Sequence, residues 1–341
     1  MRLQANGRVK LGAKRNDLTP EFSALVIGRG RGLAAFAQGA ASFPTGQVRM
    51  IVPFPAGGAT DVIGRVLTHG LQNLWGQNVL QEYQPGASGL IGTRRVVQSP
   101  SDGTTLLLAS TGAILALAAS NTDPNYRITQ ELAPVSLMSA PPYILVVNPK
   151  LPAKTTAELI AYAKANPGKL TYGSSGAGTA THLSGALFQH MTGTELLHVP
   201  YRGTGPATTG LLSDQIDMLF APVVIVPHIQ SGKVRAIGVT TPKRTSLFPD
   251  IPTIAETGLP GYESLGWFGV FAPAKTPEDI VNKISADIGK VLHGAESKRL
   301  LNEQGAEPEP NAAPVFAKFV EAEVKKWLDL GKAANIKLSN N

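Results

Sequence analysis

From residue 48 onward the chain repeats one unit, in which an apolar run is followed by a Gly-rich polar turn and then by a segment with helical periodicity. In the first unit the run 48–54 precedes the turn 55–60, and the next segment places apolar residues at i, i+3 and i+4 before it ends near Gly76. This alternation predicts an α/β fold in which a parallel or mixed sheet is flanked by helices. Further strands are expected at 105–109, 143–147, 170–174, 196–201, 218–221, 234–239 and 267–271.

The length and composition favour a folded protein of about two domains. The chain has 341 residues, of which 43% are hydrophobic and 16% charged, so it is too apolar for a disordered protein. It contains no cysteine, which excludes disulfides, iron–sulfur clusters, thiolate zinc sites and cysteine nucleophiles. No low-complexity linker interrupts residues 48–335, and we therefore expect the chain to cross between its two domains more than once.

The net charge of +7 is concentrated at the amino terminus, because residues 1–45 contribute +5 and the rest of the chain only +2. An almost neutral body argues against a surface that binds nucleic-acid phosphates. A basic stretch that ends at Arg31, the apolar run 33–43 and the small residues that follow have the order of an export signal, with cleavage expected after Ala41. The alternatives are a basic tail without structure and a misassigned start.

Catalytic signatures are absent from the sequence. It has no HExxH pair, its six histidines are scattered, and no serine has glycines two positions before and after it. The turn 176–178 has the context of a dinucleotide site, but Thr181 occupies the third glycine position, and no Walker lysine follows any Gly-rich turn. We therefore predict no catalytic residue, no metal and no cofactor. The longest uncharged stretch, 104–122, contains too many polar residues for a membrane span and predicts a buried strand plus a helix.

Two strand-to-helix junctions, 55–61 and 174–179, are the strongest candidates for a binding site. Each offers free backbone N–H groups at a helix start, where the helix dipole favours an anion and glycine lets a ligand approach closely. The alternative is that both are ordinary turns, but two of them on one edge of a sheet favour a carboxylate ligand at the carboxyl ends of the strands. The candidate residues are Ala56, Gly57, Gly58, Thr60 and Asp61 in the first junction, and Ser174, Ser175, Gly176, Gly178 and Thr179 in the second.

Several side chains near these junctions have two interpretations. Asp61 fits a helix cap and also an acceptor for a ligand amine or hydroxyl. His182 fits a packed or capping histidine in the first helical turn better than a base. Arg202, which follows Tyr201 at another strand end, either faces solvent or binds an anionic ligand tail. Phe54 either lines the pocket or packs in the core.

The residues at these junctions resemble the Bug solute receptors of tripartite tricarboxylate transporters. The resemblance begins with the first strand and loop, VRMIVPFPAGGATD at 48–61. It covers about residue 46 to the end of the chain and holds in the order of the motifs as well as in their residues. Further matching segments are PGASG at 85–89, NPGKLTYGS at 166–174, His182-Leu183, VPYRG at 199–203, PDIPTIAE at 249–256 and WFGVFAP at 267–273.

This resemblance implies an α/β periplasmic binding protein of type II, a Venus flytrap with two lobes of mixed sheets flanked by helices. The first lobe is expected to comprise residues 46–141 plus 266–341, and the second lobe residues 142–265. Residues 1–45 would be a degenerate signal peptide or a basic tail.

The resemblance also implies how the ligand is held. One carboxylate is expected between the loops 56–61 and 174–179, partly through ordered waters. The distal end of the ligand is expected near residues 201–205, which include Tyr201 and Arg202, and near Ser110 and Thr111 after the strand 105–109.

One departure from the family concerns the position after the strand 218–220. Family members usually carry an acidic residue there, whereas this chain has Ala221 and Pro222, which argues against an amino acid as ligand. The sequence thus favours a non-catalytic, monomeric, periplasmic receptor that captures a mono- or dicarboxylate and hands it transiently to the inner-membrane subunits of a transporter. The alternatives are an enzyme for a carboxylated substrate, with His182 or Asp61 as base, and a sensory module that docks on a signalling protein.

Overall fold

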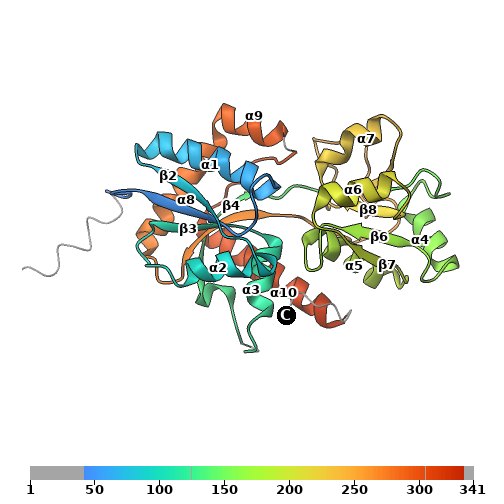
Figure 1. Cartoon of the computed structure of the whole chain (residues 1–341), viewed down its shortest axis with the longest axis horizontal. Helices are drawn as coiled ribbons and strands as arrows, with labels where there is room; N and C mark the ends of the chain where they lie inside the picture. The colour runs from blue at the N-terminus through green and yellow to red at the C-terminus, as the bar shows by residue number, and fades with distance from the viewer. Residues whose placement is uncertain (1–41, 124, 304, 334–341) are drawn as a thin grey trace, which may run out of the picture. The chain divides into compact units, whose positions relative to one another are not determined.

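The computed structural model describes residues 42–123, 125–303 and 305–333 (Figure 1). The predicted export signal up to Ala41 lies outside the described residues. The described strands form two five-stranded sheets, which define a first and a second lobe.

The first lobe contains a sheet with the strand order β2-β1-β3-β10-β4. Strand β1 is parallel to β2 and β3, whereas β10 is antiparallel to both of its neighbours. The sheet is therefore mixed, and its last strand comes from a part of the sequence beyond the second lobe. The strands are β1 (Val48–Val52), β2 (Val79–Tyr83), β3 (Thr105–Ser110), β4 (Leu132–Ser139) and β10 (Phe268–Pro273).

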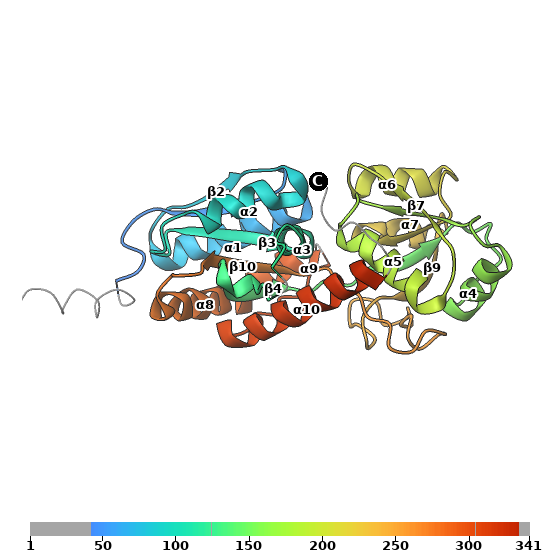
Figure 2. The ribbon, with the colours of Figure 1, turned by 90° about the horizontal axis from the view of Figure 1, so that it is seen from below.

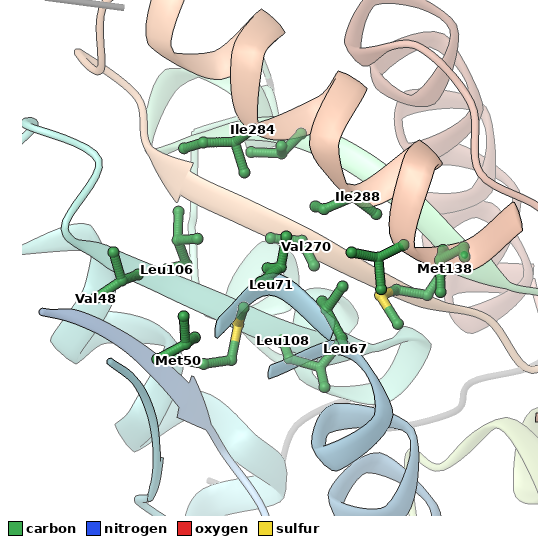
Figure 3. Close-up of a cluster of buried hydrophobic side chains, with 14 of the residues drawn as sticks. Val48, Met50, Leu67, Leu71, Leu106, Leu108, Met138, Val270, Ile284 and Ile288 are labelled. Atoms are coloured by element: carbon green, nitrogen blue, oxygen red, sulfur yellow. The ribbon is translucent and has the colours of Figure 1, made fainter. Parts of the chain in front are cut away.

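Helices cover both faces of this sheet. Met50 and Val52 of β1 belong to the apolar cluster under α1, α8 and α9, and Ile51 belongs to the cluster under α2, α3 and α10, as the two-residue period of a strand requires. Figure 3 shows Leu67 of α1 and Ile284 of α8 within the first of these clusters, and Figure 2 shows α10 along the opposite layer. The helices are α1 (Ala59–Trp75), α2 (Leu90–Val97), α3 (Thr111–Ala119), α8 (Glu278–His293), α9 (Ala295–Glu303) and α10 (Ala313–Ala333), with the 3₁₀ turns η1 (Ala87–Gly89) and η2 (Ile128–Gln130).

The second lobe has a sheet with the order β7-β6-β8-β5-β9. Side chains of α4 and α5 pack on one face, and side chains of α6 and the segment before α7 pack on the other. The strands are β5 (Ile144–Val147), β6 (Thr171–Ser174), β7 (Leu197–Pro200), β8 (Met218–Ala221) and β9 (Arg235–Val239), and the helices are α4 (Thr156–Ala165), α5 (Ala180–Thr192), α6 (Thr204–Leu212), the 3₁₀ turn η3 (Val223–Ile225) and α7 (Val226–Gln230).

The two sheets share one spatial arrangement of strands, although the fourth strand comes last in the sequence of the first sheet (β10) and first in that of the second (β5). Strands β6, β7, β8, β5 and β9 take the places of β1, β2, β3, β10 and β4, with the same parallel and antiparallel pairings. A helix connects β1 to the edge strand β2 and β6 to the edge strand β7, and a later strand, β3 or β8, pairs on the other side. This reversal of order is the point at which open α/β sheets bind ligands, at the carboxyl ends of the strands.

The sequence-based fold class, two mixed sheets flanked by helices, is confirmed. The uncharged stretch 104–122 forms β3 and α3, as predicted. The first strand is shorter than the predicted 48–54, because it ends at Val52 before Pro53, a residue without an amide to donate. Of the helices that the structure describes, none combines the length and the apolar character needed to cross a bilayer.

The chain passes between the two sheets after β4 and again after β9. The two connections pair through an antiparallel bridge between Pro142 and Leu265. A double crossing was expected from the missing linker. The lobe boundaries near residues 141 and 265 stay a prediction.

Candidate ligand-binding site

The first loop (53–58) joins β1 to α1. Gly57 has a φ of +87°, and its amide donates a hydrogen bond of 2.6 Å to Oδ2 of Asp61. The amides of Ala59, Thr60 and Asp61 have no acceptor among the described residues. They are the unsatisfied donors of a helix start, and they remain available to a ligand.

Protein donors surround the carboxylate of Asp61, which is buried. Arg65 Nε donates to it at 2.8 Å, Gln81 Nε2 at 2.9 Å and the Tyr83 hydroxyl at 2.6 Å. The hydrogen-bonded guanidinium of Arg65 holds the pKa of this carboxyl well below its usual range. Asp61 is therefore ionised, its charge is balanced by Arg65, and its oxygens anchor the first loop.

The second loop (175–179) joins β6 to α5. Gly178 has a φ of +74°, and its amide donates a hydrogen bond of 3.1 Å to Nδ1 of His182. The amides of Ala180, Thr181 and His182 have no acceptor within the described part of the chain. The start of α5 thus offers the same kind of donors as the start of α1.

Hydroxyl groups brace the second loop internally. Thr181 Oγ1 accepts from the Ser175 amide at 2.9 Å and lies 3.1 Å from Thr179 Oγ1. Thr179 Oγ1 donates to the Gly176 carbonyl at 2.7 Å, and Ser174 Oγ accepts from the Gly176 amide at 3.1 Å. The hydroxyls of Ser174, Ser175 and Thr179, three of the candidate binding residues, therefore make bonds that shape the loop.

The two loops share a sequence pattern as well as a geometry. Residues 56–61 are Ala-Gly-Gly-Ala-Thr-Asp, and residues 177–182 are Ala-Gly-Thr-Ala-Thr-His. In both, the glycine has a positive φ and the last side chain accepts its amide. The matching threonines, Thr60 and Thr181, are both buried. The Thr60 hydroxyl, unlike that of Thr181, has no partner among the described residues.

The start of α3 lies against the second loop. A Cβ atom on Gly112 would be 3.6 Å from the carbonyl oxygen of Gly178. Thr111 is buried, and its hydroxyl accepts from the Trp267 amide at 3.0 Å. Ser110 occupies the cap position of α3 without making a capping bond. The structure therefore brings Ser110 and Thr111, from the first lobe, close to the candidate site of the second.

The remaining predicted residues lie nearby in different settings. Phe54 is half-buried and packs on the apolar cluster that contains α3, with its ring next to Gly89. Tyr201 packs its ring against Gly210 of α6, within the second lobe. Arg202 is exposed, and no hydrogen bond or ion pair joins it to another described residue. The side chain of Arg202 is therefore more accessible than that of Tyr201.

Some residues that shape the site were missed by the sequence analysis. His198 of β7 stacks on His182 with 4.0 Å between ring centroids and lies 2.6 Å from Ser174 Oγ. The shared Ala-Gly-x-Ala-Thr pattern was the signal that could have found Thr181, whereas contacts across strands have no comparable signal in one sequence. The described residues include no group of three or more His, Asp or Glu side chains able to hold a metal ion. The missed residues are Thr181, His198, Arg65, Gln81 and Tyr83.

A family model described as the tripartite tricarboxylate transporter family receptor matches residues 63–336. The chain belongs to this receptor family. The receptor is 36% identical to protein BugT of Bordetella pertussis over 300 residues, which cover 87% of this chain and 92% of BugT.

Solved structures support the same assignment. The structure of R. palustris Rpa4515 with adipate has a TM-score of 0.75 and 35% identity, and the match covers 86% of this chain and 99% of that one. MatC (Rpa3494) from Rhodopseudomonas palustris with bound malate has a TM-score of 0.72 and 32% identity, over 84% and 99% of the two chains. The resemblance to Bug receptors is thus confirmed. Members of this family are periplasmic solute-binding receptors, as the structure of the periplasmic binding protein BugD also indicates, so the enzyme alternative is set aside.

Proposed function

We propose that this receptor captures a small dicarboxylate, with one carboxylate held jointly by the main-chain amides at the starts of α1 and α5. The observation that carries the proposal is the pair of matched helix starts. Each leaves its first amides without acceptors, and neither adds net negative charge, because Asp61 is paired with Arg65 and His182 is neutral. Such a start attracts an anion through its dipole and its free donors.

The chemistry around the two loops favours a ligand without an ammonium group. Ala221 ends β8, which is the parallel neighbour of β6, so it lies at the same edge of the sheet as the second loop. Neither Ala221 nor the following Pro222 offers a carboxylate to a ligand amine. Arg202, exposed after β7, and Ser110, at the start of α3, are our proposed contacts for the distal carboxylate. Adipate in Rpa4515 and malate in MatC are ligands of this class.

The direct test is calorimetric titration of the purified protein after unfolding and refolding to remove any co-purified ligand. Adipate and malate are the first probes, and adipamide is the matched control, since it has the length of adipate without its charge. We expect one site per chain for at least one dicarboxylate and no heat from the diamide. Failure of every dicarboxylate, or equal binding of adipamide, would contradict the proposal.

We further propose that the exported protein works as a monomer and delivers its ligand to inner-membrane transporter subunits when the lobes close. Amino-terminal sequencing of the exported protein tests cleavage after Ala41, and light scattering tests the monomer. Capture of membrane subunits that requires the bound dicarboxylate would support delivery. Capture of a signalling protein in their place would favour the sensory alternative.

A further inference from the structure

Three rings are stacked beneath the second loop. His182 of α5 lies on His198 of β7 with 4.0 Å between centroids, and His198 lies on Tyr172 of β6 with 4.9 Å. Tyr172 and His198 are directly opposite each other on neighbouring strands, so their side chains share one face of the sheet. Both His182 and Tyr172 are buried.

Both imidazoles make hydrogen bonds that fix the second loop. The Gly178 amide donates to His182 Nδ1 at 3.1 Å, and His198 Nε2 is 2.6 Å from the Ser174 hydroxyl. That hydroxyl also accepts from the Gly176 amide at 3.1 Å. Because a protonated nitrogen cannot accept, the first bond requires a neutral His182 with its proton on Nε2.

The surroundings of the stack keep it neutral. Burial lowers the pKa of His182 to about 4, with a further contribution from His198, and burial lowers the pKa of His198 to about 4. The titratable groups that face His182 are His198 from β7 and Tyr172 from β6, and burial raises the pKa of Tyr172. Within the described part of the chain, no carboxylate contributes to the pKa of either imidazole.

At two other helix starts, a carboxylate accepts the hydrogen bond from the amide four residues before it, as His182 does from Gly178. Asp61 in α1 accepts the Gly57 amide at 2.6 Å, and Glu158 in α4 accepts the Lys154 amide at 2.7 Å, in each case four residues apart. The helix dipole favours such acidic side chains. His182 makes the same bond without a negative charge, so the dipole of α5 stays uncompensated and can act on an anionic ligand.

We propose that His182 and His198 are positioning residues for the second loop, a neutral stacked pair that holds the Gly178 amide and the Ser174 hydroxyl so that the amides of α5 stay free for an anion. This inference deepens the proposed function and rests on it. The role belongs to the pair, since His198 supports the ring of His182 and fixes the strand end from which the loop begins.

The first test uses the wild-type protein without ligand. Nitrogen-15 NMR of the imidazoles should show the Nε2–H tautomer for His182 and no titration of either ring between pH 8 and about 5, since an unperturbed histidine titrates near 6.5. Titration of His182 near that value, or the Nδ1–H tautomer, would overturn the proposal. This measurement does not depend on the ligand.

The second test compares variants at position 182 by calorimetry with adipate and malate, and by amide hydrogen exchange of residues 174–182 without ligand. His182→Leu removes the acceptor at similar size, and we expect about 10-fold weaker binding and faster exchange in the loop. His182→Gln restores a neutral acceptor that reaches back to the preceding amides, and we expect binding within about 3-fold of wild type. His190→Leu is the control, because His190 is an exposed residue of the same helix.

Wild-type affinity and exchange in His182→Leu, or no rescue by His182→Gln, would overturn the positioning role. His198→Phe keeps an aromatic stack but removes the bond to Ser174, and it should weaken binding less than His182→Leu; an effect as small as that of His190→Leu would remove His198 from the proposal. A wild-type protein that binds neither dicarboxylate contradicts the proposed function instead, while the tautomer and exchange results still decide how the loop is held.

Discussion

The first and second loops have the same backbone arrangement but are anchored by side chains of different charge. In each, the amide of a glycine with positive φ donates to a side chain four residues later, and the first three amides of the following helix have no acceptor among the described residues. The first loop uses an ionised carboxylate, Asp61, with Arg65 as its partner. The second uses a neutral imidazole, His182, with another imidazole as its partner. The free amides are therefore the shared feature, and neither anchor adds an unbalanced negative charge beside them.

The two solutions also differ in their exposure to solvent. The side chain of Arg65 is 66% exposed, whereas that of Asp61 is only 3% exposed, so the ion pair joins a buried carboxylate to a guanidinium at the surface of the first lobe. The pair that anchors the second loop lies between α5 and β7, where burial sets the protonation state. Acid should therefore affect the two loops in different pH ranges.

The largest effect is expected when an aspartate replaces His182, because no arginine beside it would balance the charge as Arg65 balances that of Asp61. His182→Asp should weaken dicarboxylate binding about 100-fold, because a carboxylate without an arginine partner repels the ligand and is costly to bury. Calorimetry at pH 7.5 measures this loss, with His190→Asp on the exposed side of α5 as the control. Tight binding by His182→Asp would show that the charge of the anchor is irrelevant.

Acid should separate the two anchors. The pKa of His182 in the folded protein, about 4, lies below the unfolded value near 6.5. The unfolded chain therefore binds more protons between these values, and the contribution of His182 to the free energy of unfolding should fall by about 3 kcal/mol as the pH drops through this window. Asp61, whose folded pKa is also lowered, contributes stability that is present above about pH 4 and lost below it. Urea unfolding from pH 8 to 3 measures both.

The variant His182→Gln isolates the contribution of His182 to this pH dependence, because the glutamine side chain does not titrate. The variant should lose the share of the slope between pH 6.5 and 4 that comes from His182, keep the share that comes from His198, and keep the loss below pH 4. The same slope in the variant and the wild type would assign the first window to other groups.

The matched threonines give a smaller effect. Thr181→Val should lower the free energy of unfolding by about 1–2 kcal/mol, because the Ser175 amide loses its acceptor. Thr60→Val should change stability by less than about 0.5 kcal/mol, since no bond of its hydroxyl is lost, but it should weaken dicarboxylate binding, because Thr60 is a candidate binding residue whose hydroxyl has no partner among the described residues. Urea denaturation measures the stability of both variants, and calorimetry measures their affinity for dicarboxylates. Equal destabilisation by the two substitutions would contradict the different roles of Thr60 and Thr181.

The smallest effect concerns the support of Asp61. Tyr83→Phe removes a hydrogen bond of 2.6 Å to this carboxylate and should lower the free energy of unfolding by about 1 kcal/mol. The loss of stability below about pH 4 should change little, because Arg65 still pairs with Asp61. Tyr162→Phe is the control, since the hydroxyl of Tyr162 has no partner among the described residues. Similar stability losses in the two variants would argue against a supporting role for Tyr83.

The sequence supplied the local features of the site. Hydrophobic periodicity placed α1 and its end at Gly76, and the Gly-rich junctions marked both loops, because strand-to-helix turns need special backbone angles and free amides. Asp61 was recognised as a capping residue, and the structure shows that it holds the Gly57 amide.

The contacts between elements were not accessible in this way. The stack of His198 on Tyr172 depends on the register of β6 and β7, and the bonds from Gln81 and Tyr83 to Asp61 depend on the edge strand β2. Register follows from long-range packing and has no mark in a single strand. The ring of Tyr201, expected near the ligand, packs against α6 because the small Gly210 leaves room for it.

The helix that carries the second loop has another attachment. Leu183, directly after His182, belongs to the apolar cluster of the first lobe together with residues of α3 and α10. Moving α5 away from the first lobe far enough to bring this leucine into water would cost about 1.5–3 kcal/mol. The contact between Leu183 and the first lobe therefore favours the arrangement in the structure whether or not a solute is bound.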